Sequence, residues 1–428
     1  MKQYSLIILL VLCTFLSSNL FAQRTVIHAG TLLDVETGET LNEVSIIINE
    51  GMIDDVRNGY VSARNSDKVI DLKNKTVLPG LIDLHVHLEG ETSPTRYLDQ
   101  FTLNDADKAF RSTLYAKRTL LAGFTTVREL GGTGVNISLR NAINDGFIEG
   151  PRVITVGKSL ATTGGHADPT NGWKNDLMGD PGPKEGVANG ADAARKAVRQ
   201  RYKNGADHIK ITATGGVLSV AKSGDAPQFF EDELEAIVST ARDYGMHVAA
   251  HAHGAEGMKR AVEAGVLTIE HGTKMTAEVM DLMIEKGAYY VPTISAGKFV
   301  AEKAEVEGYY PPLVVPKARE IGPMIQDTFA EAYQKGVKIA FGTDAGVFPH
   351  GENGKEFRYM VEAGMPAMEA IQSATIVAAA VLGLENKTGS ISPGKQADIV
   401  AVDTNPLNDI DSLANVTFVM KGGTVYKD

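Results

Sequence analysis

Eight strand-like segments that alternate with helix-like segments, together with β-rich stretches at both ends, predict an α/β protein. One strand and one helix recur every ~30 to 40 residues, and eight such βα units are the content of a (β/α)8 TIM-type barrel. The terminal stretches predict a small β-sandwich domain beside it. A chain of 428 residues, with 43% hydrophobic and 22% charged residues, is long and apolar enough for both units.

Residues 1–22 have the three parts of a secretory signal peptide. Lys2 supplies positive charge, residues 5–16 are apolar, and residues 19–22 form a cleavage site before Gln23. The apolar run is shorter than the ~20 residues that a membrane-spanning helix needs, and no charged flank follows it. The segment therefore predicts a periplasmic or secreted protein with no stable membrane anchor after cleavage.

Cys13 is the single cysteine of the chain and lies inside this segment. Leu12 stands where a small residue is expected before a lipidated cysteine, and lipidation of Cys13 is left open. After cleavage the chain would have no thiol, no disulfide and no cysteine metal ligand.

The β-sandwich domain is expected from residues 23–79 together with residues 388–428. Both stretches consist of short β-rich segments punctuated by Gly, Asn and Asp turns, at residues 24–35, 44–56, 67–79, 389–406 and 415–428. Neither stretch alone has enough strands for a stable sandwich, so the simplest packing joins the two.

The barrel is expected from residues 80–387. Its eight strand candidates are residues 81–87, 123–130, 152–160, 206–216, 247–254, 266–273, 288–295 and 338–346. Helical stretches separate many of them, at residues 192–204, 232–245, 255–265, 277–287 and 367–383, and several end in the glycine of a C-cap. In such a barrel the catalytic groups lie at the C-terminal ends of the strands.

His85 and His87 end the first of these strands. Because residues i and i+2 of a strand point to the same side, both imidazoles can face one metal ion, although such a pair also occurs by chance. Other strand candidates carry possible ligands at or near their ends: Lys210, His251, His271 and Asp344. Imidazoles with a carboxylate suit zinc or a similar divalent ion. Asp344 could also accept a proton from metal-bound water, whose pKa the ion lowers towards ~7.

Lys210 is the unusual member of this set. A buried ammonium beside metal cations is unfavourable unless its charge is changed. Carboxylation by carbon dioxide would make Lys210 an anionic bridge between two ions. A salt bridge or a contact with a substrate phosphate is the alternative, but no phosphate-cradling loop accompanies the lysine.

The formal net charge of -11 argues against a nucleic-acid-binding surface, and no polybasic run indicates a membrane-surface patch.

The motifs together resemble the amidohydrolase superfamily over nearly the whole mature chain. They are the PGLID turn before His-x-His, the lysine and histidines of the later strands, GTDAG at 342–346 and PGKQADIVAVD at 393–403. TVRELGG, TGGH and KITATGGV are similar to a branch with imidazolonepropionase-like proteins and bacterial Xaa-Pro dipeptidases, some members of which act as Xaa-Arg or Xaa-Lys carboxypeptidases.

This resemblance implies a binuclear centre of two divalent ions, with Zn²⁺ as the expected metal. His85, His87 and Asp344 would bind the more buried ion, His251 and His271 the more exposed one. Carboxylated Lys210 and a hydroxide would bridge them. Asp344 would deprotonate the bridging water and then protonate the leaving amine.

Further residues are candidates for catalysis or substrate binding. His253, where many relatives carry a tyrosine, and His166 could stabilise the intermediate or bind substrate; loop or surface hydrogen bonding is the alternative. Arg128 could hold a substrate carboxylate, or form an ion pair with a neighbouring acid. Other possible pocket elements are Tyr289, Tyr290, Lys222, Ser223 and the insert at residues 300–316.

The expected function is hydrolysis of the amide bond of dipeptides or N-acyl amino acids, and Xaa-Pro dipeptides are the first expected substrates. The alternatives are an Xaa-Arg/Lys carboxypeptidase, for which Asp168, Asp225 or Glu352 could pair with the basic side chain, and an imidazolonepropionase-like hydrolase of cyclic amides. A non-catalytic binding protein on the same barrel is a third class. The expected partner is a small peptide or N-acyl amino acid, and a homo-oligomer is possible.

Overall fold

The computed structural model describes residues 24–174, 176–177 and 179–428. The expected signal peptide at residues 1–22, including Cys13, lies outside the described residues, so it stays a prediction. Among the helices of the described residues, none is long and apolar enough to cross a membrane.

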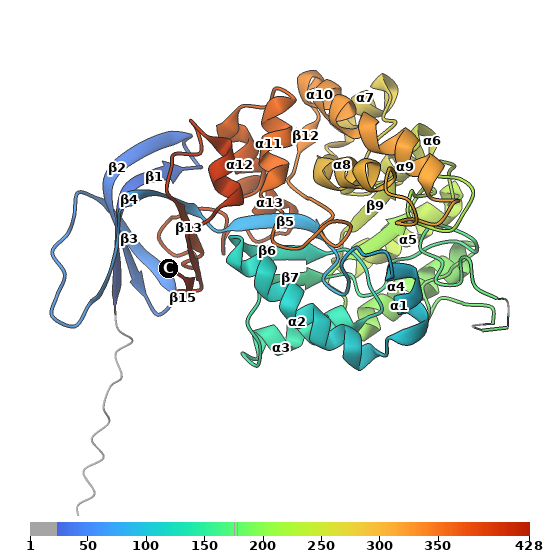
Figure 1. Cartoon of the computed structure of the whole chain (residues 1–428), viewed down its shortest axis with the longest axis horizontal. Coiled ribbons are helices and arrows are strands. Elements are labelled where there is room, and N and C mark those ends of the chain that lie inside the picture. The colour runs from blue at the N-terminus through green and yellow to red at the C-terminus, as the bar shows by residue number, and fades with distance from the viewer. Residues whose placement is uncertain (1–23, 175, 178) are drawn as a thin grey trace, which may run out of the picture.

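A seven-stranded sheet lies at one end of the molecule and contains strands from both ends of the chain (Figure 1). Its strands are β1 (Thr25–Asp34), β2 (Glu39–Asn49), β3 (Met52–Asn58), β4 (Lys68–Pro79), β13 (Ile399–Val402), β14 (Phe418–Lys421) and β15 (Thr424–Lys427). Their order is β15-β14-β13-β4-β1-β2-β3, and the two terminal segments meet where β4 pairs antiparallel with β13. The segments do combine, but in a single sheet, so the expected β-sandwich is not confirmed.

The apolar side chains of these strands explain why the sheet forms. Ile27, Ile46, Val77 and Ile399 belong to one buried cluster, separate from the main core. Between this sheet and the larger part of the molecule, Arg152 donates to Asp398 at 2.9 Å. β4 ends at Pro79 and β5 begins at Leu81, but the expected domain boundaries stay a prediction.

Eight parallel strands form the centre of the larger part, which establishes the α/β class. They are β5 (Leu81–Val86), β6 (Phe124–Glu129), β7 (Arg152–Thr155), β8 (Ile209–Thr212), β9 (Val248–Ala252), β10 (Thr268–His271), β11 (Tyr289–Val291) and β12 (Lys338–Ile339). Each lies within one of the expected strand segments. They are arranged as two sheets, β5-β6-β7 and β12-β11-β10-β9-β8. Nearly all of their residues are buried, as is typical of parallel strands covered by helices.

Backbone hydrogen bonds join the edges of these two sheets. On one side, Leu84 N donates to Phe341 O at 3.0 Å and Asp344 N donates to His85 O at 2.7 Å. On the other side, Leu160 N donates to Lys210 O at 2.8 Å. The segment after β12 is therefore held against β5, which brings Asp344 beside His85.

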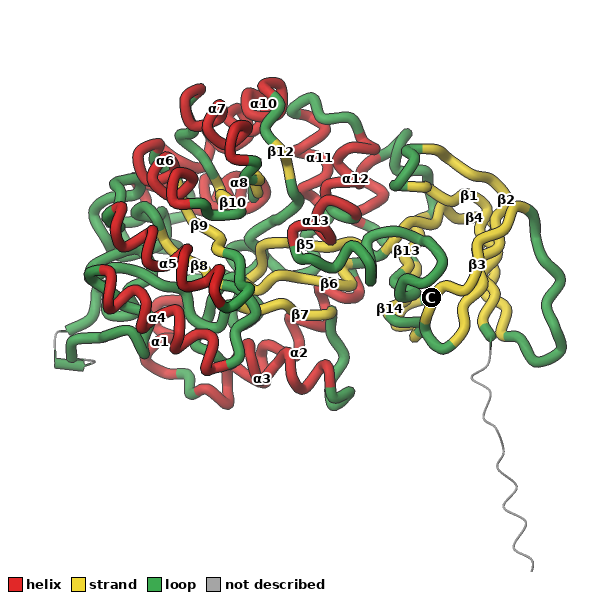
Figure 2. The backbone as a smooth tube through the Cα atoms, turned by 180° about the vertical axis from the view of Figure 1, so that it is seen from behind, coloured by secondary structure: helices red, strands yellow, loops and turns green. Residues whose placement is uncertain are grey.

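Helices surround the central strands (Figure 2). They are α1 (Arg96–Thr102), α2 (Asp105–Leu121), α3 (Val135–Asn144), α4 (Ala191–Asn204), α5 (Glu231–Asp243), α6 (Ala255–Ala264), α7 (Ala277–Lys286), α8 (Ile294–Lys303), α9 (Val315–Ile321), α10 (Ile325–Lys335), α11 (Lys355–Glu362), α12 (Ala367–Ser373) and α13 (Ile376–Val381), with short 3₁₀ turns at Gly322–Met324 and Ile410–Ala414.

Two features of these helices test the expected boundaries. α6 and α7 end at Gly265 and Gly287, which take the left-handed conformation of a C-cap, as predicted. The single helix expected at residues 367–383 is wrong, because Thr375 adopts a non-helical conformation and divides it into α12 and α13. The Thr375 hydroxyl donates to Ile371 O at 2.7 Å, a local bond that competes with helical geometry.

Candidate metal centre

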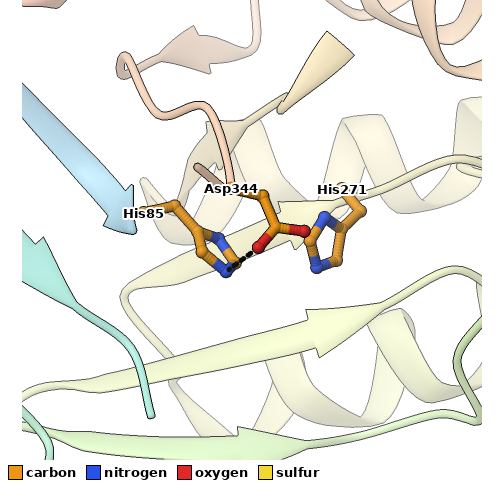
Figure 3. Close-up of side chains that lie close together, drawn as sticks. All are labelled: His85, His271 and Asp344. Atoms are coloured by element: carbon orange, nitrogen blue, oxygen red, sulfur yellow. Dashed lines mark ion pairs between the residues drawn. The ribbon is translucent and has the colours of Figure 1, made fainter. Parts of the chain in front are cut away.

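His85, His271 and Asp344 form a buried cluster in which one possible ligand atom from each lies within 4.8 Å of the others (Figure 3). They come from β5, β10 and the segment after β12. His271 and Asp344 have φ values of 70° and 62°, a left-handed conformation that is uncommon for residues other than glycine. Such strain at the ends of strands is typical of functional sites, and it marks both positions as parts of one.

The hydrogen bonds of the first two histidines fix which nitrogen faces the cluster. The Nδ1 of His87 lies 2.8 Å from Gly131 O, and the Nδ1 of His85 lies 2.8 Å from the Glu270 carboxylate. A carbonyl and a carboxylate can only accept, so both Nδ1 atoms carry a proton. In a neutral imidazole the Nε2 atom then presents a lone pair.

Both Nε2 atoms face Asp344. The Oδ1 of Asp344 lies 3.3 Å from Nε2 of His87 and 3.5 Å from Nε2 of His85, and it is buried without a hydrogen bond of good geometry. Burial would lower the pKa of His87, but the Asp344 and Glu129 carboxylates raise it to about 9. The space between these groups therefore favours a positive charge, a proton when no metal is bound and a divalent ion otherwise. The donor set fits a metal.

Lys210 lies beside this cluster, with its Nζ 3.5 Å from Nε2 of His85. Burial lowers the pKa of Lys210 to about 8, although Glu270 and Asp344 oppose the shift. Within the described part of the chain no carboxylate oxygen lies within 4.0 Å of its Nζ, so the expected salt-bridge alternative has no partner. Lys210 is thus a buried amine of lowered pKa beside the candidate metal cluster, and its expected carboxylation stays a prediction.

His251 and His253, at the end of β9, complete the group of imidazoles. The ring of His251 lies 4.6 Å from that of His271, and the ring of His253 lies 5.1 Å from it. Nε2 of His251 lies 3.1 Å from Gly215 O and must donate to it, which leaves Nδ1 as its free lone pair. Burial, reinforced by neighbouring imidazoles, holds the pKa values of His251 and His271 well below 6.5. Both rings are therefore neutral, as metal ligands must be.

Glu270 is a functional residue that sequence reasoning missed. Its carboxylate is fully buried. It accepts a hydrogen bond from Nη2 of Arg128 at 2.9 Å and another from Nδ1 of His85 at 2.8 Å. Burial would raise the pKa of Glu270, but the Arg128 guanidinium lowers it to about 2. The anion therefore persists and orients the His85 ring, as second partners of metal ligands commonly do. The signal available in the sequence was the alternation of residues along β10, where a glutamate directly precedes His271.

Two expected substrate-binding residues do not reach the site. Arg128 is 1% exposed, and its guanidinium donates hydrogen bonds to Glu270, Thr268 and the carbonyl of Leu84. It therefore cannot hold a substrate carboxylate. The ion-pair alternative is correct, with Glu270 as the partner. Tyr289 is the first residue of β11, at the end opposite the ligands, where Lys338 lies over its ring. Tyr290 is buried and donates to His271 O at 2.8 Å.

A cavity of about 840 Å³ opens above the cluster. His85, His87, Lys210, His251, His271 and Asp344 all line it, as do His166 and His253. The His166 ring stacks on His251 at 4.3 Å and lies against Gly216, where a Cβ would come within 2.2 Å of the ring. The Nδ1 of His166 is buried without a hydrogen-bond partner. His166 therefore contacts His251 and lines the cavity.

Most of the acids and loop residues expected near the pocket are engaged elsewhere. Asp225 pairs with Lys274 and Glu352 with Lys355, and neither lines the cavity. Asp168 does line it, but its carboxylate accepts from the backbone of Gly164 and Thr170 and from the Thr170 hydroxyl. Lys222 and Ser223 lie outside the lining, whereas Val300 and Pro311 of the insert contribute to it.

Lys317 on α9 fixes the loop that follows β8. Its buried ammonium donates to three carbonyl oxygens, those of Gly216, Ser219 and Ala221, at 2.9, 2.7 and 2.9 Å. Burial lowers the pKa of Lys317 to about 8. This loop carries cavity-lining residues from Val217 to Val220, so Lys317 holds one wall of the cavity in place.

Comparison with known proteins gives a consistent result. Residues 76–426 match the model of the amidohydrolase family. The chain is 32% identical over 434 residues to ochratoxinase from Aspergillus niger, across 95% of this chain and 87% of that protein. A crystal structure of a Xaa-Pro dipeptidase with methionine in its active site is 55% identical, with a TM-score of 0.93 and coverage of 95% and 100%. A prolidase complexed with N-methylphosphonate-L-proline is 34% identical, with a TM-score of 0.86 and coverage of 95% and 100%.

We expect Glu270→Gln to lower both stability and metal affinity. The change leaves the buried guanidinium of Arg128 without a counter-charge, which typically costs ~3 to 5 kcal/mol of unfolding free energy. It also weakens the orientation of His85, for which a ~10- to 100-fold loss of metal affinity is typical. Urea unfolding and metal titration measure the two effects. Glu352→Gln, on a partly exposed glutamate, is the matched control. Unchanged stability and metal affinity in Glu270→Gln would contradict this role.

Proposed function

The chain belongs to the amidohydrolase family, and from that premise we propose that it is a binuclear metal-dependent dipeptidase with Xaa-Pro dipeptides as its preferred substrates. Hydrolysis of small amide or peptide substrates is the general activity to which the relatives point. The observation that carries the proposal is the convergence of the Nε2 atoms of His85 and His87 on the buried Oδ1 of Asp344, at the base of a cavity that also contains Lys210.

The proposed ligand sets follow from which atoms are free. His85 and His87 would use Nε2 and Asp344 its Oδ1 for one ion, while His251 and His271 would hold the second, with carboxylated Lys210 between the two. Divalent ions bound there would supply a polarised carbonyl and a water acidic enough to act as nucleophile at neutral pH, and Zn²⁺ suits this donor set.

Asp344 is the proposed proton carrier. Its buried Oδ1 would hold the ion, which leaves the other carboxylate oxygen to take the proton of the attacking water and to pass it to the leaving nitrogen. His166 and His253 line the same cavity and would orient the substrate carbonyl and stabilise the charge that develops on its oxygen.

The proposal includes closure of the eight central strands as a TIM-type barrel. The hydrogen bonds between β5 and the segment after β12, and between Leu160 and β8, support it. It also includes a periplasmic or secreted location, for which residues 1–22 are the support.

The preference for proline is supported by the apolar section of the cavity wall. Val217, Val300, Ile321, Ile325 and Val347 line it, and each is buried. A basic side chain would instead need a buried carboxylate as partner, and Asp168, Asp225 and Glu352 are already engaged. An apolar wall accepts a pyrrolidine ring without that requirement.

We expect the mature protein to bind about two divalent ions per chain and Lys210→Ala to lose both metal and activity, because the bridging anion is removed. Small carboxylic acids should restore part of the activity by replacing the bridge. Metal analysis and turnover measure these effects, with Lys222→Ala as the surface control. Full activity of Lys210→Ala without rescue would contradict the bridging role.

Asp344→Asn keeps the size of the side chain but removes its basicity. We expect turnover to fall by at least the ~10² to 10⁴ typical of general acid-base catalysis, with the fold retained. Steady-state kinetics with parallel metal analysis and circular dichroism give the result. Near-normal turnover at correct metal content would show that another group moves the proton.

Matched substrates test the proposed specificity. We expect the highest kcat/KM for Ala-Pro, followed by Ala-Leu and then Ala-Arg, because the apolar side chains of the wall suit proline and leucine and offer a guanidinium no partner. The order Ala-Arg before Ala-Pro would favour the carboxypeptidase alternative. Efficient turnover of an imidazolone substrate alone would overturn the peptidase assignment.

A further inference from the structure

We propose that Arg96, at the start of α1, binds the free α-carboxylate of the substrate, so that a free C-terminus is a condition for productive binding. The inference rests on the proposed function for the identity of the substrate. It assigns to Arg96 the role that the buried Arg128 cannot perform.

The first observation is a guanidinium without an acceptor. Arg96 lines the cavity, and its Nη1 is buried without a hydrogen-bond partner. Within the described ranges no carboxylate oxygen lies within 4.0 Å of it, in contrast to Arg111, which pairs with Asp99 at 2.9 Å. An N–H group buried in this way is unfavourable until an acceptor arrives.

The second observation is another unpartnered donor, in the insert. Tyr310 is 7% exposed, and its hydroxyl is also buried without a hydrogen-bond partner. Burial raises the pKa of Tyr310, so the hydroxyl stays protonated. Pro311, the next residue, lines the cavity, whereas Tyr310 is not part of the lining. Arg96 is therefore the donor that a carboxylate in the cavity reaches directly.

Contacts of neighbouring residues connect the segments that carry Arg96 and Tyr310. The neighbouring Tyr97 donates to Leu218 O at 2.8 Å, in the loop that Lys317 fixes. Thr92 and Tyr309 share a hydrogen bond of 2.9 Å, which ties the segment before α1 to the insert. A receptor preorganised by three segments loses little freedom when it takes up a ligand.

Other cations of the cavity are less suited to the role. Lys210 lies among the metal ligands, and Lys317, just behind the wall, is occupied by three carbonyl oxygens. Lys158 also lines the cavity, but an ammonium is a point charge, whereas a guanidinium matches a carboxylate with two parallel N–H groups. Lys158 therefore provides the matched control.

The test measures binding of L-proline and of L-prolinamide by calorimetry to the metal-loaded wild type, Arg96→Met, Arg96→Lys and Lys158→Met. The two probes differ in one group, because an uncharged amide NH2 in L-prolinamide replaces the charged oxygen of L-proline. We expect the wild type and Lys158→Met to favour proline by roughly 10²-fold, as for a desolvated charge pair, and Arg96→Met to bind both probes equally. Arg96→Lys should retain part of the preference. In turnover of Ala-Pro, the loss in Arg96→Met should fall mainly on KM, with metal content unchanged.

The outcomes separate the two claims. Equal affinity of the wild type for both probes, absence of measurable binding included, would overturn the role of Arg96, as would a preference that survives in Arg96→Met. Loss of the preference in Lys158→Met instead would overturn it and assign the carboxylate to Lys158. A wild type that favours proline through Arg96 but does not hydrolyse Ala-Pro would overturn the proposed function alone.

Discussion

The site depends on one electrostatic constraint: several electron-pair donors are buried facing one another, and each must be held neutral or paired. Glu270 meets this constraint at two residues. Its carboxylate balances the positive charge of Arg128, and it fixes the proton of His85 on the nitrogen that faces away from the cluster. Gly131 O does the same for His87. What remains between these rings and Asp344 is room for positive charge.

The surrounding fold serves to hold these donors at the ends of parallel strands. His271 is oriented by the hydroxyl of Thr293, which itself has a left-handed φ of 55°. The buried carboxylate of Glu356 accepts from the backbone of Ile294 and Ser295 at 2.7 Å and so fixes the start of α8 directly after Thr293. The left-handed conformation of Thr293 is thus held by the buried Glu356 side chain of α11, which is how such backbone conformations persist.

Local periodicity in the sequence predicted much of this arrangement. It did not predict how deep within the fold each side chain lies. His85 and His87 were found because alternation along a strand places both on one face. Arg128 and Tyr289 were misplaced because spacing along the chain does not tell whether a side chain lies above the strands, within them or at their opposite ends. Glu270 escaped for a related reason, since its partners come from β5 and β6. The open-edged terminal sheet, in place of the expected sandwich, likewise depends on pairing between distant segments.

The pairing of β4 with β13 also sets an order of folding. Pro79 meets Ile399, so one edge of β4 has no partner until nearly the whole chain has been synthesised. The strands from β1 to β4 can pair locally, but the sheet is completed only when β13, β14 and β15 have been synthesised. Contacts so distant in sequence make folding slow and leave an unpaired strand edge open to other chains meanwhile. Shortening the C-terminus would therefore impair assembly of the N-terminal strands, far from the catalytic groups.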